Sequence, residues 1–407
     1  MSTKLQREVL KPAGNRLYCD LFVNYELIVE GCLMIIMDLR AHNFYAFQHF
    51  HINFSYPKKI VHSNIPDEHL PERDNFRYKK AVILMGPNAS GKTSLGRILM
   101  RIISQIHRKD LSALRSMVAD PAKESTFSIE FVVDEPVLYR VSARFLPVRE
   151  DEDPGSGIFV AVRHTAIGKR DSYEACVDRL DQQKAEETTD YTEQLRKIPG
   201  FGWSFVLSEN SDPSIPIHFE SKERLHIFET VMKVLDPAIV SVTSLQQVEN
   251  SYLINYPNRK VIIQEGKVVN KDLLSSGTYE GISVASMLAS IICKDNGFYY
   301  CDEKFSKIQS DVEKAVLAVM IDSLGDYDQL FFTTHNTDIL TMPYPKHTFM
   351  FLKKDMSDEE TIRVINASDY LQRASDSLRS AVENDLFSIT PNVEAILSLG
   401  EEGDGES

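Results

Sequence analysis

Long apolar runs are missing from this sequence, and so is the usual layout of a secretion signal. The best candidate for a membrane span, residues 27–37, is short and is interrupted by Glu30. The first residues, MSTKLQREVLKPAG, lack a charged stretch followed by an apolar one. These absences predict a cytoplasmic protein with no membrane partner.

Cysteine is scarce as well, with five in 407 residues. The five form no CxxC pair and have no metal-ligand spacing, so we expect reduced thiols and no disulfide framework. They are Cys19, Cys32, Cys176, Cys293 and Cys301.

A surplus of positive charge is also absent, because the formal net charge is -14. That balance argues against a surface that binds nucleic acid everywhere by counterion release. Short basic clusters such as Lys79-Lys80 and Arg108-Lys109 leave a local groove open, although clusters of this size are more often solvated surface. The sequence therefore neither excludes DNA binding nor gives direct support for it.

The strongest positive signal is AVILMGPNASGKTSLGRILM, residues 81–100. Its apolar start predicts a buried strand, its end predicts an amphipathic helix, and the loop between them matches GxxxxGK[ST], the P-loop. Glycines let the backbone N–H groups turn toward phosphate oxygens, and the following helix adds its positive end. We expect Lys92 to reach the β- and γ-phosphates and the Thr93 hydroxyl to bind Mg²⁺. The predicted nucleotide-binding residues here are Gly86, Pro87, Asn88, Ala89, Ser90, Gly91, Lys92, Thr93 and Ser94.

Other segments alternate between strand and helix signals. Residues 173–197 are polar, charged and helix-favouring, which predicts a solvated helix or a flexible insertion. A helix is also predicted at residues 220–235. Strands or hairpins are predicted at residues 33–54, 126–134, 137–145, 240–256 and 261–269.

The second half of the chain supplies further polar groups at the ends of apolar stretches. LSSGTYEGISVASMLASIIC, residues 274–293, predicts a helix capped by Ser275 or Ser276, and alone it implies nothing more. GFYYC, residues 297–301, predicts a buried strand followed by Asp302 and Glu303. Acidic groups at such a strand end can hold Mg²⁺ through water and activate an attacking water. QLFFTT, residues 329–334, predicts another buried strand, which ends at His335.

The order P-loop, serine/glycine helix start, strand-DE and strand-His resembles that of ABC-type ATPases, in particular the soluble SMC, RecF and OLD-type branch. LSSGT resembles the signature motif LSGGQ, FYYCDE resembles Walker B, and FFTTHN resembles the strand with the switch histidine. DLRAHNFYAFQHFHINF is similar to the first hairpin of that branch. The resemblance covers about residues 33–352. It implies an α/β fold of the ABC-ATPase head type, a P-loop NTPase with a mixed sheet, an antiparallel β subdomain and a helical signature subdomain.

The resemblance also implies an Mg²⁺-dependent ATPase that works as facing heads. The P-loop of one copy would hold ATP, and the helix start at Ser275, Ser276 and Gly277 of the other would cap the γ-phosphate. Glu303 would activate water and His335 would contact the γ-phosphate. Thr93 and Asp302 would hold Mg²⁺. The implied catalytic residues are Lys92, Glu303 and His335.

Departures from the family pattern point to a stand-alone head. No Q-loop glutamine can be assigned, residues 173–197 are too short for an SMC coiled coil, and residues 353–407 are too few for an OLD nuclease domain. The chain resembles the ATPase subunits of bacterial anti-phage systems of the PARIS, retron and Septu types. That likeness implies a sensor or scaffold that forms dimers or larger homo-oligomers. It also implies a trans-acting effector, a nuclease being one candidate, and a phage-encoded trigger.

Alternative functions belong to other classes. A RecF-like DNA-repair ATPase would act on DNA directly, and a transporter ATPase or a small-molecule kinase fits the motifs less well. The expected organisation has five parts: an N-terminal extension (1–32), an ATPase lobe with the first hairpin, P-loop and β subdomain (33–147), an insertion or helical arm (148–239), an ATPase lobe with signature, Walker B and switch histidine (240–352), and a C-terminal segment with a disordered acidic tail (353–407).

Overall fold

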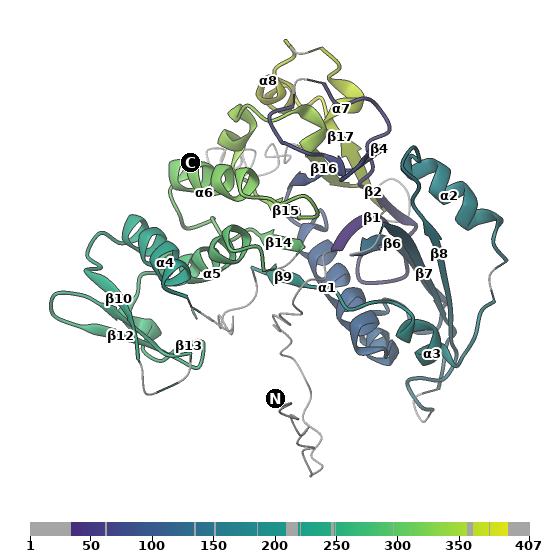
Figure 1. The fold of residues 1–407 in the computed structure, drawn as a ribbon, viewed down its shortest axis with the longest axis horizontal. Coiled ribbons are helices and arrows are strands. Elements are labelled where there is room, and N and C mark those ends of the chain that lie inside the picture. The colour runs from purple at the N-terminus through teal and green to yellow at the C-terminus, as the bar shows by residue number, and fades with distance from the viewer. Residues whose placement is uncertain are drawn as a thin grey trace, which may run out of the picture.

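The computed structural model describes residues 34–389, apart from 62, 134–135, 150–151, 185, 209–218, 220, 246–247, 249, 296, 356–360 and 374. The predicted extension 1–32 and the predicted acidic tail lie outside the described residues. A central sheet stands between an antiparallel sheet, at the right in Figure 1, and a helical lobe with a small sheet at the left.

The central sheet carries the P-loop strand in its middle. Its strands follow the order β17 (Ile362–Asn366), β16 (Phe349–Lys354), β5 (Ala81–Met85), β15 (Gln329–Thr333), β14 (Phe298–Asp302) and β9 (Trp203–Val206). Neighbours run parallel except β17, which is antiparallel to β16. Every residue of β5, β14 and β15 is buried, because both faces of the central sheet are covered, one by helices and the other by α1 together with the antiparallel sheet.

Alternation along β5 shows how the two faces are filled. Val82 and Leu84 pack in a core with α1 (Lys92–Arg108), whereas Ile83 and Met85 face the core formed by α5 (Ser276–Ile292) and α6 (Ser310–Asp322). The predicted strand, loop and helix around the P-loop are therefore present. The fold is α/β, with a mixed central sheet whose strand β5 leads through the P-loop into α1.

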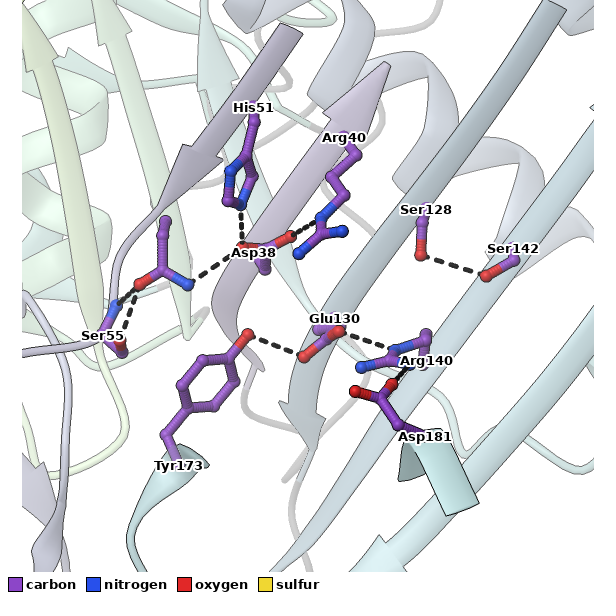
Figure 2. A network of polar contacts seen from close by, with 11 residues as sticks. Asp38, Arg40, His51, Ser55, Ser128, Glu130, Arg140, Ser142, Tyr173 and Asp181 are labelled. Carbon is purple, nitrogen blue, oxygen red and sulfur yellow. Dashed lines mark hydrogen bonds and ion pairs between the residues drawn. The ribbon is translucent and has the colours of Figure 1, made fainter. Parts of the chain in front are cut away.

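The antiparallel sheet forms the β subdomain. Its order is β2 (Phe50–Asn53), β1 (Met34–His42), β6 (Ser125–Val133), β7 (Val137–Phe145) and β8 (Ile158–Ala166). One face joins the core of α1, and the other packs against α2 (Tyr173–Gln182) and the hairpin of β3 (His69–Leu70) and β4 (Arg73–Arg77). Where the register of β1 shifts, the buried Asp38 accepts hydrogen bonds from His51 (2.6 Å) and Asn53 (2.9 Å) (Figure 2).

A buried ionic network attaches α2 to this sheet (Figure 2). Glu130 on β6 accepts a hydrogen bond from Arg140 Nε (2.6 Å) and another from the Tyr173 hydroxyl (2.7 Å). Arg140 also pairs with Asp181 at the end of α2. Burial raises the pKa of Glu130, although Tyr173 and Arg140 act in the opposite direction. The first part of residues 173–197 is thus helical, as predicted, but one face of α2 is buried against the sheet, so this helix is not a flexible insertion.

Residues 148–239 differ from the expected insertion, because they supply strands to two sheets, β8 to the antiparallel sheet and β9 to the central one. The smaller helices of the chain are α3 (Tyr191–Arg196), α7 (Ala367–Tyr370) and α8 (Leu378–Glu383), with 3₁₀ turns at Ser112–Met117, Lys271–Leu273, Thr337–Thr341 and Lys346–Thr348.

A small lobe precedes the signature helix. Its helix α4 (Lys222–Leu235) packs on α5, and its antiparallel sheet has the order β10 (Ser241–Ser244), β11 (Tyr252–Asn255), β12 (Lys260–Gln264) and β13 (Lys267–Val268). Val242, Ile254 and Ile263 turn their side chains into the same core as α5. The predicted strands at 240–256 and 261–269 are therefore present, joined into a meander (Figure 1).

Candidate nucleotide site

The P-loop turns at two glycines with positive φ. Gly86 (φ +153°) follows β5, and a Cβ there would collide with the backbone of Leu352. Gly91 (φ +99°) precedes α1, and a Cβ there would lie 2.6 Å from Ile362 Cδ1. The first N–H groups of a helix have no intrahelical partner, and here they open into the loop. The buried Ser90 hydroxyl has no hydrogen-bond partner among the described residues, as expected of a group that would bind a phosphate oxygen.

Lys92 places a buried cation inside this loop. Its Nζ donates to the carbonyl oxygens of Gly86 (2.8 Å) and Pro87 (3.1 Å) and lies 3.3 Å from Glu303 Oε1. Burial lowers the pKa of Lys92, while the charges of Glu303 and Asp302 act to raise it. A cation held in this way is suited to bind phosphate oxygens.

Asp302 is the last residue of β14 and accepts hydrogen bonds from three hydroxyl groups. Its Oδ2 accepts hydrogen bonds from Thr93 Oγ1 (2.9 Å) and Ser208 Oγ (2.8 Å), and its Oδ1 accepts one from Thr333 Oγ1 (2.7 Å). The carboxylate is fully buried. Mg²⁺ prefers oxygen ligands and uses few protein groups beside phosphates and water, so Thr93 and Asp302 fit it. When bound, Mg²⁺ would neutralise charge on the phosphate oxygens.

Glu303 lies beside Lys92 and has an unusual backbone conformation. Its φ is +48°, in the left-handed region that is uncommon for residues other than glycine. Its Oε1 lies 2.9 Å from Nε2 of His335, which follows β15. Burial alone would raise the pKa of Glu303, but the hydrogen bond from His335 and the charge of Lys92 outweigh burial and lower it. The carboxylate is therefore ionised at neutral pH and can accept a proton.

Among the described residues, the hydrogen bonds of the signature stretch stay within the start of α5 and do not reach this cluster. Ser275 caps α5, its Oγ accepting a hydrogen bond from the Thr278 N–H (3.1 Å), and both Ser275 and Ser276 are exposed. Gly277 packs on the backbone of Lys307, whose carbonyl oxygen would lie 2.8 Å from a Cβ at that glycine. The structure thus brings together Lys92, Thr93, Asp302, Glu303 and His335, while Ser275, Ser276 and Gly277 stand beside Lys307.

Ser208 is a member of the site that sequence reasoning missed. It follows β9, and β9 pairs in parallel with β14 up to Val206 opposite Cys301, so the next residues emerge beside Asp302. The signal in the sequence is the short apolar run WSFV before a polar stretch. These four residues lie within residues 200–216, a region rich in turn-forming residues, which obscures the strand.

Comparison with solved structures finds SMC heads. One is an SMC head bound to the C-terminal winged-helix domain of ScpA (14% identity, TM-score 0.47, covering 83% of this chain and 99% of that one). Another is the SMC head domain from Thermotoga maritima (13%, 0.39, 81% and 98%). A third is the Smc head with an extended coiled coil bound to the C-terminal domain of ScpA from Pyrococcus furiosus (11%, 0.47, 84% and 98%). No family model and no curated protein matches the chain.

The description of the fold therefore rests on the order of the strands in the central sheet and on the P-loop between β5 and α1. Among the described residues, no helix combines the length and the apolar character that crossing a membrane would require.

Proposed function

We propose that this chain binds ATP with Mg²⁺ and hydrolyses it. The observation that carries the proposal is the meeting of Lys92, Glu303 and His335 within hydrogen-bonding range, next to the Thr93–Asp302 pair. Lys92 would bind the β- and γ-phosphates, and Thr93 and Asp302 would hold Mg²⁺. Glu303 would take the proton of the attacking water, and His335 would contact the γ-phosphate.

We propose further that two copies face each other across ATP. Ser275 and Ser276, at the start of α5, are exposed, and the next residue, Gly277, packs on Lys307. The hydrogen bonds of Lys92 go to Gly86 and Pro87, so within the described residues the start of α5 does not bind Lys92. The positive end of this helix would therefore cap a γ-phosphate held by a second copy. ATP would join the heads and hydrolysis would separate them.

A regulatory role extends the same proposal. The sequence resembles stand-alone ATPase subunits of anti-phage systems, and this resemblance supports a cytoplasmic sensor or scaffold that controls a separate effector protein after a phage-encoded trigger. Each nucleotide state would then correspond to a different assembly. Co-expression with the neighbouring genes tests this step: a partner that leaves on ATP hydrolysis supports it, and purification of the chain alone counts against it.

The central test is the solution mass of Glu303→Gln with and without Mg-ATP, beside wild-type turnover. We expect the variant to bind ATP, to hydrolyse it at least about 100-fold more slowly and to gain mass in its presence, because the general base is removed while the phosphate contacts stay. Lys92→Ala, the matched variant, should lose ATP binding or turnover and show no gain in mass.

Two outcomes would contradict the proposal. Hydrolysis by Glu303→Gln at the wild-type rate would show that another group is the base. A monomeric mass with ATP bound would exclude the facing-heads arrangement while leaving nucleotide binding intact.

A further inference from the structure

A buried carboxylate lies beneath the loop that carries His335. Glu313, in the first turn of α6, is 2% exposed and uses both of its oxygens. Oε1 accepts a hydrogen bond from Thr334 Oγ1 (2.6 Å), and Oε2 accepts one from Asn336 Nδ2 (2.7 Å). Thr334 and Asn336 are the residues immediately before and after His335. One side chain therefore holds the loop on both sides of the histidine.

Further polar contacts connect the same loop to the start of α6. Asn336 Nδ2 also donates to Ser310 Oγ (2.8 Å), and the Ser310 hydroxyl donates to Asp338 Oδ2 (2.8 Å). The Asp338 N–H returns a hydrogen bond to Asn336 Oδ1 (3.0 Å). These partly buried polar groups satisfy one another and so favour this arrangement of the loop.

Packing does not fix the imidazole of His335 from its other side. The side chain of His335 is 41% exposed, and it borders a hollow of about 370 Å³ that Glu303 and Phe305 also line. Within the site, Nε2 of the His335 ring contacts Glu303 Oε1 at 2.9 Å. The place of the ring therefore depends on the backbone at residues 334–336.

We infer that Glu313 is a positioning residue for ATP hydrolysis, which sets His335 against Glu303 by binding Thr334 and Asn336. The inference rests on the proposed ATPase function. Glu313 touches neither Lys92 nor the P-loop in any contact described above, so its action would fall on the chemical step and spare nucleotide binding. Misplacing a catalytic group by about 1 Å can slow a reaction about 100-fold.

The chemistry of the contacts matches a carboxylate at this position. Thr334 and Asn336 both act as donors toward Glu313, so the side chain must offer two acceptors. Glutamine offers one acceptor, so it can accept from Thr334 or from Asn336 but not from both, and one of the two present hydrogen bonds must be lost or reversed. Burial raises the pKa of Glu313, while the two hydrogen bonds act to lower it, and no cation pairs with it in these contacts.

The test exchanges the two groups that face each other. Glu313→Gln leaves one acceptor for two donors, Asn336→Asp creates a conflict between two carboxylates, and the double variant lets the new amide donate to the new carboxylate. Asp311→Asn is the matched control, because Asp311 lies in the same helical turn with its side chain 93% exposed. Steady-state hydrolysis, ATP binding and hydrogen exchange of nucleotide-free protein over residues 333–339 are measured for each variant.

We expect kcat of Glu313→Gln to fall roughly 10- to 100-fold while the Kd for ATP stays within about twofold of the wild type. Hydrogen exchange over residues 333–339 should speed up. The double variant should recover most of kcat and of the exchange protection, a coupling that two independent changes would not show. Asp311→Asn should match the wild type in every measurement.

Three results would overturn the inference. The first is an unchanged kcat together with unchanged exchange in Glu313→Gln. The second is a loss of ATP binding in proportion to kcat, which would assign Glu313 a general structural role. The third is a double variant as impaired as the two single changes combined. If the wild-type protein fails to hydrolyse ATP, the proposed function fails, and the exchange data still decide whether Glu313 holds the loop.

Discussion

Two buried glutamates, Glu130 and Glu313, serve this molecule in different ways. Each accepts two hydrogen bonds, and burial raises the pKa of each. Glu130, in the antiparallel sheet, is paired with the guanidinium of Arg140 and the hydroxyl of Tyr173 (Figure 2). Glu313, beneath the His335 loop, has neutral groups as its partners in these contacts.

The difference lies in what happens when a partner is removed. An ion pair taken out of water contributes little net stability while intact, but removing one charge leaves the other buried and uncompensated. A carboxylate with neutral partners can be neutralised at small cost, yet its geometry still decides where those partners lie. We therefore expect changes at Glu130 to appear as lost stability and changes at Glu313 as lost turnover.

The largest effect is expected from Arg140→Met, which keeps much of the side-chain volume and removes the charge. The free energy of unfolding should fall by about 3 kcal/mol at pH 7, because Glu130 is then buried without its cation. Urea unfolding followed by circular dichroism measures the loss. The control is Arg144→Met on the same strand, β7. It removes exposed ion pairs with Glu124 and Glu187 and should cause a much smaller loss.

The same variant makes a prediction about pH. Without Arg140 the pKa of Glu130 should rise further above its unfolded-state value. A carboxyl group shifted in that direction contributes stability that is fully present below the unfolded-state pKa and is lost as pH rises through the folded-state pKa. The deficit of Arg140→Met should therefore be smaller at pH 5 than at pH 7. A deficit that stays constant would mean that the guanidinium acts by packing alone.

A smaller effect is expected from Tyr173→Phe. It deletes one hydroxyl and leaves Glu130 Oε2 without that donor, at a cost of about 1–2 kcal/mol in the free energy of unfolding. Hydrogen exchange should speed up in α2, because Tyr173 anchors the first turn of that helix to the sheet. A loss as large as that of Arg140→Met would show that the hydroxyl, and not the guanidinium, dominates the network.

The sequence predicted those parts of the site in which the functional residues directly follow a recognisable strand within one short motif. GPNASGKT specifies a strand, a loop and a helix within one window, and FYYCDE and FFTTH each place polar groups directly after a buried strand. Because the three strands are neighbours in a parallel sheet, their carboxyl ends meet, and Lys92, Asp302 and His335 lie at one edge.

The packing of α2 and the contacts of Glu130 and Glu313 could not be predicted, because they depend on residues far apart in the sequence. Tyr173, Cys176 and Leu180 do form a buried stripe at helical spacing, but the charged residues between them favoured a solvated helix. Glu130 and Arg140 look like ordinary strand polarity until the register of β6 and β7 sets them opposite each other. Glu313 resembles any acidic residue in the first turn of a helix, since its partners lie 21 and 23 residues away.

The smallest effect on stability is expected from Glu313→Gln, which sharpens the comparison with Glu130. The loss of one of the two hydrogen bonds that Glu313 accepts should lower the free energy of unfolding by about 1 kcal/mol or less. Burial raises the pKa of Glu313 in the folded state, so the wild type loses this contribution to stability as pH rises through that value, and the glutamine variant does not. The gap between the two proteins should therefore narrow from pH 5 to pH 8, as urea unfolding across that range would show. A gap that widens instead would mean that the folded protein favours the ionised form of Glu313, and the argument from a raised pKa at Glu313 would fail.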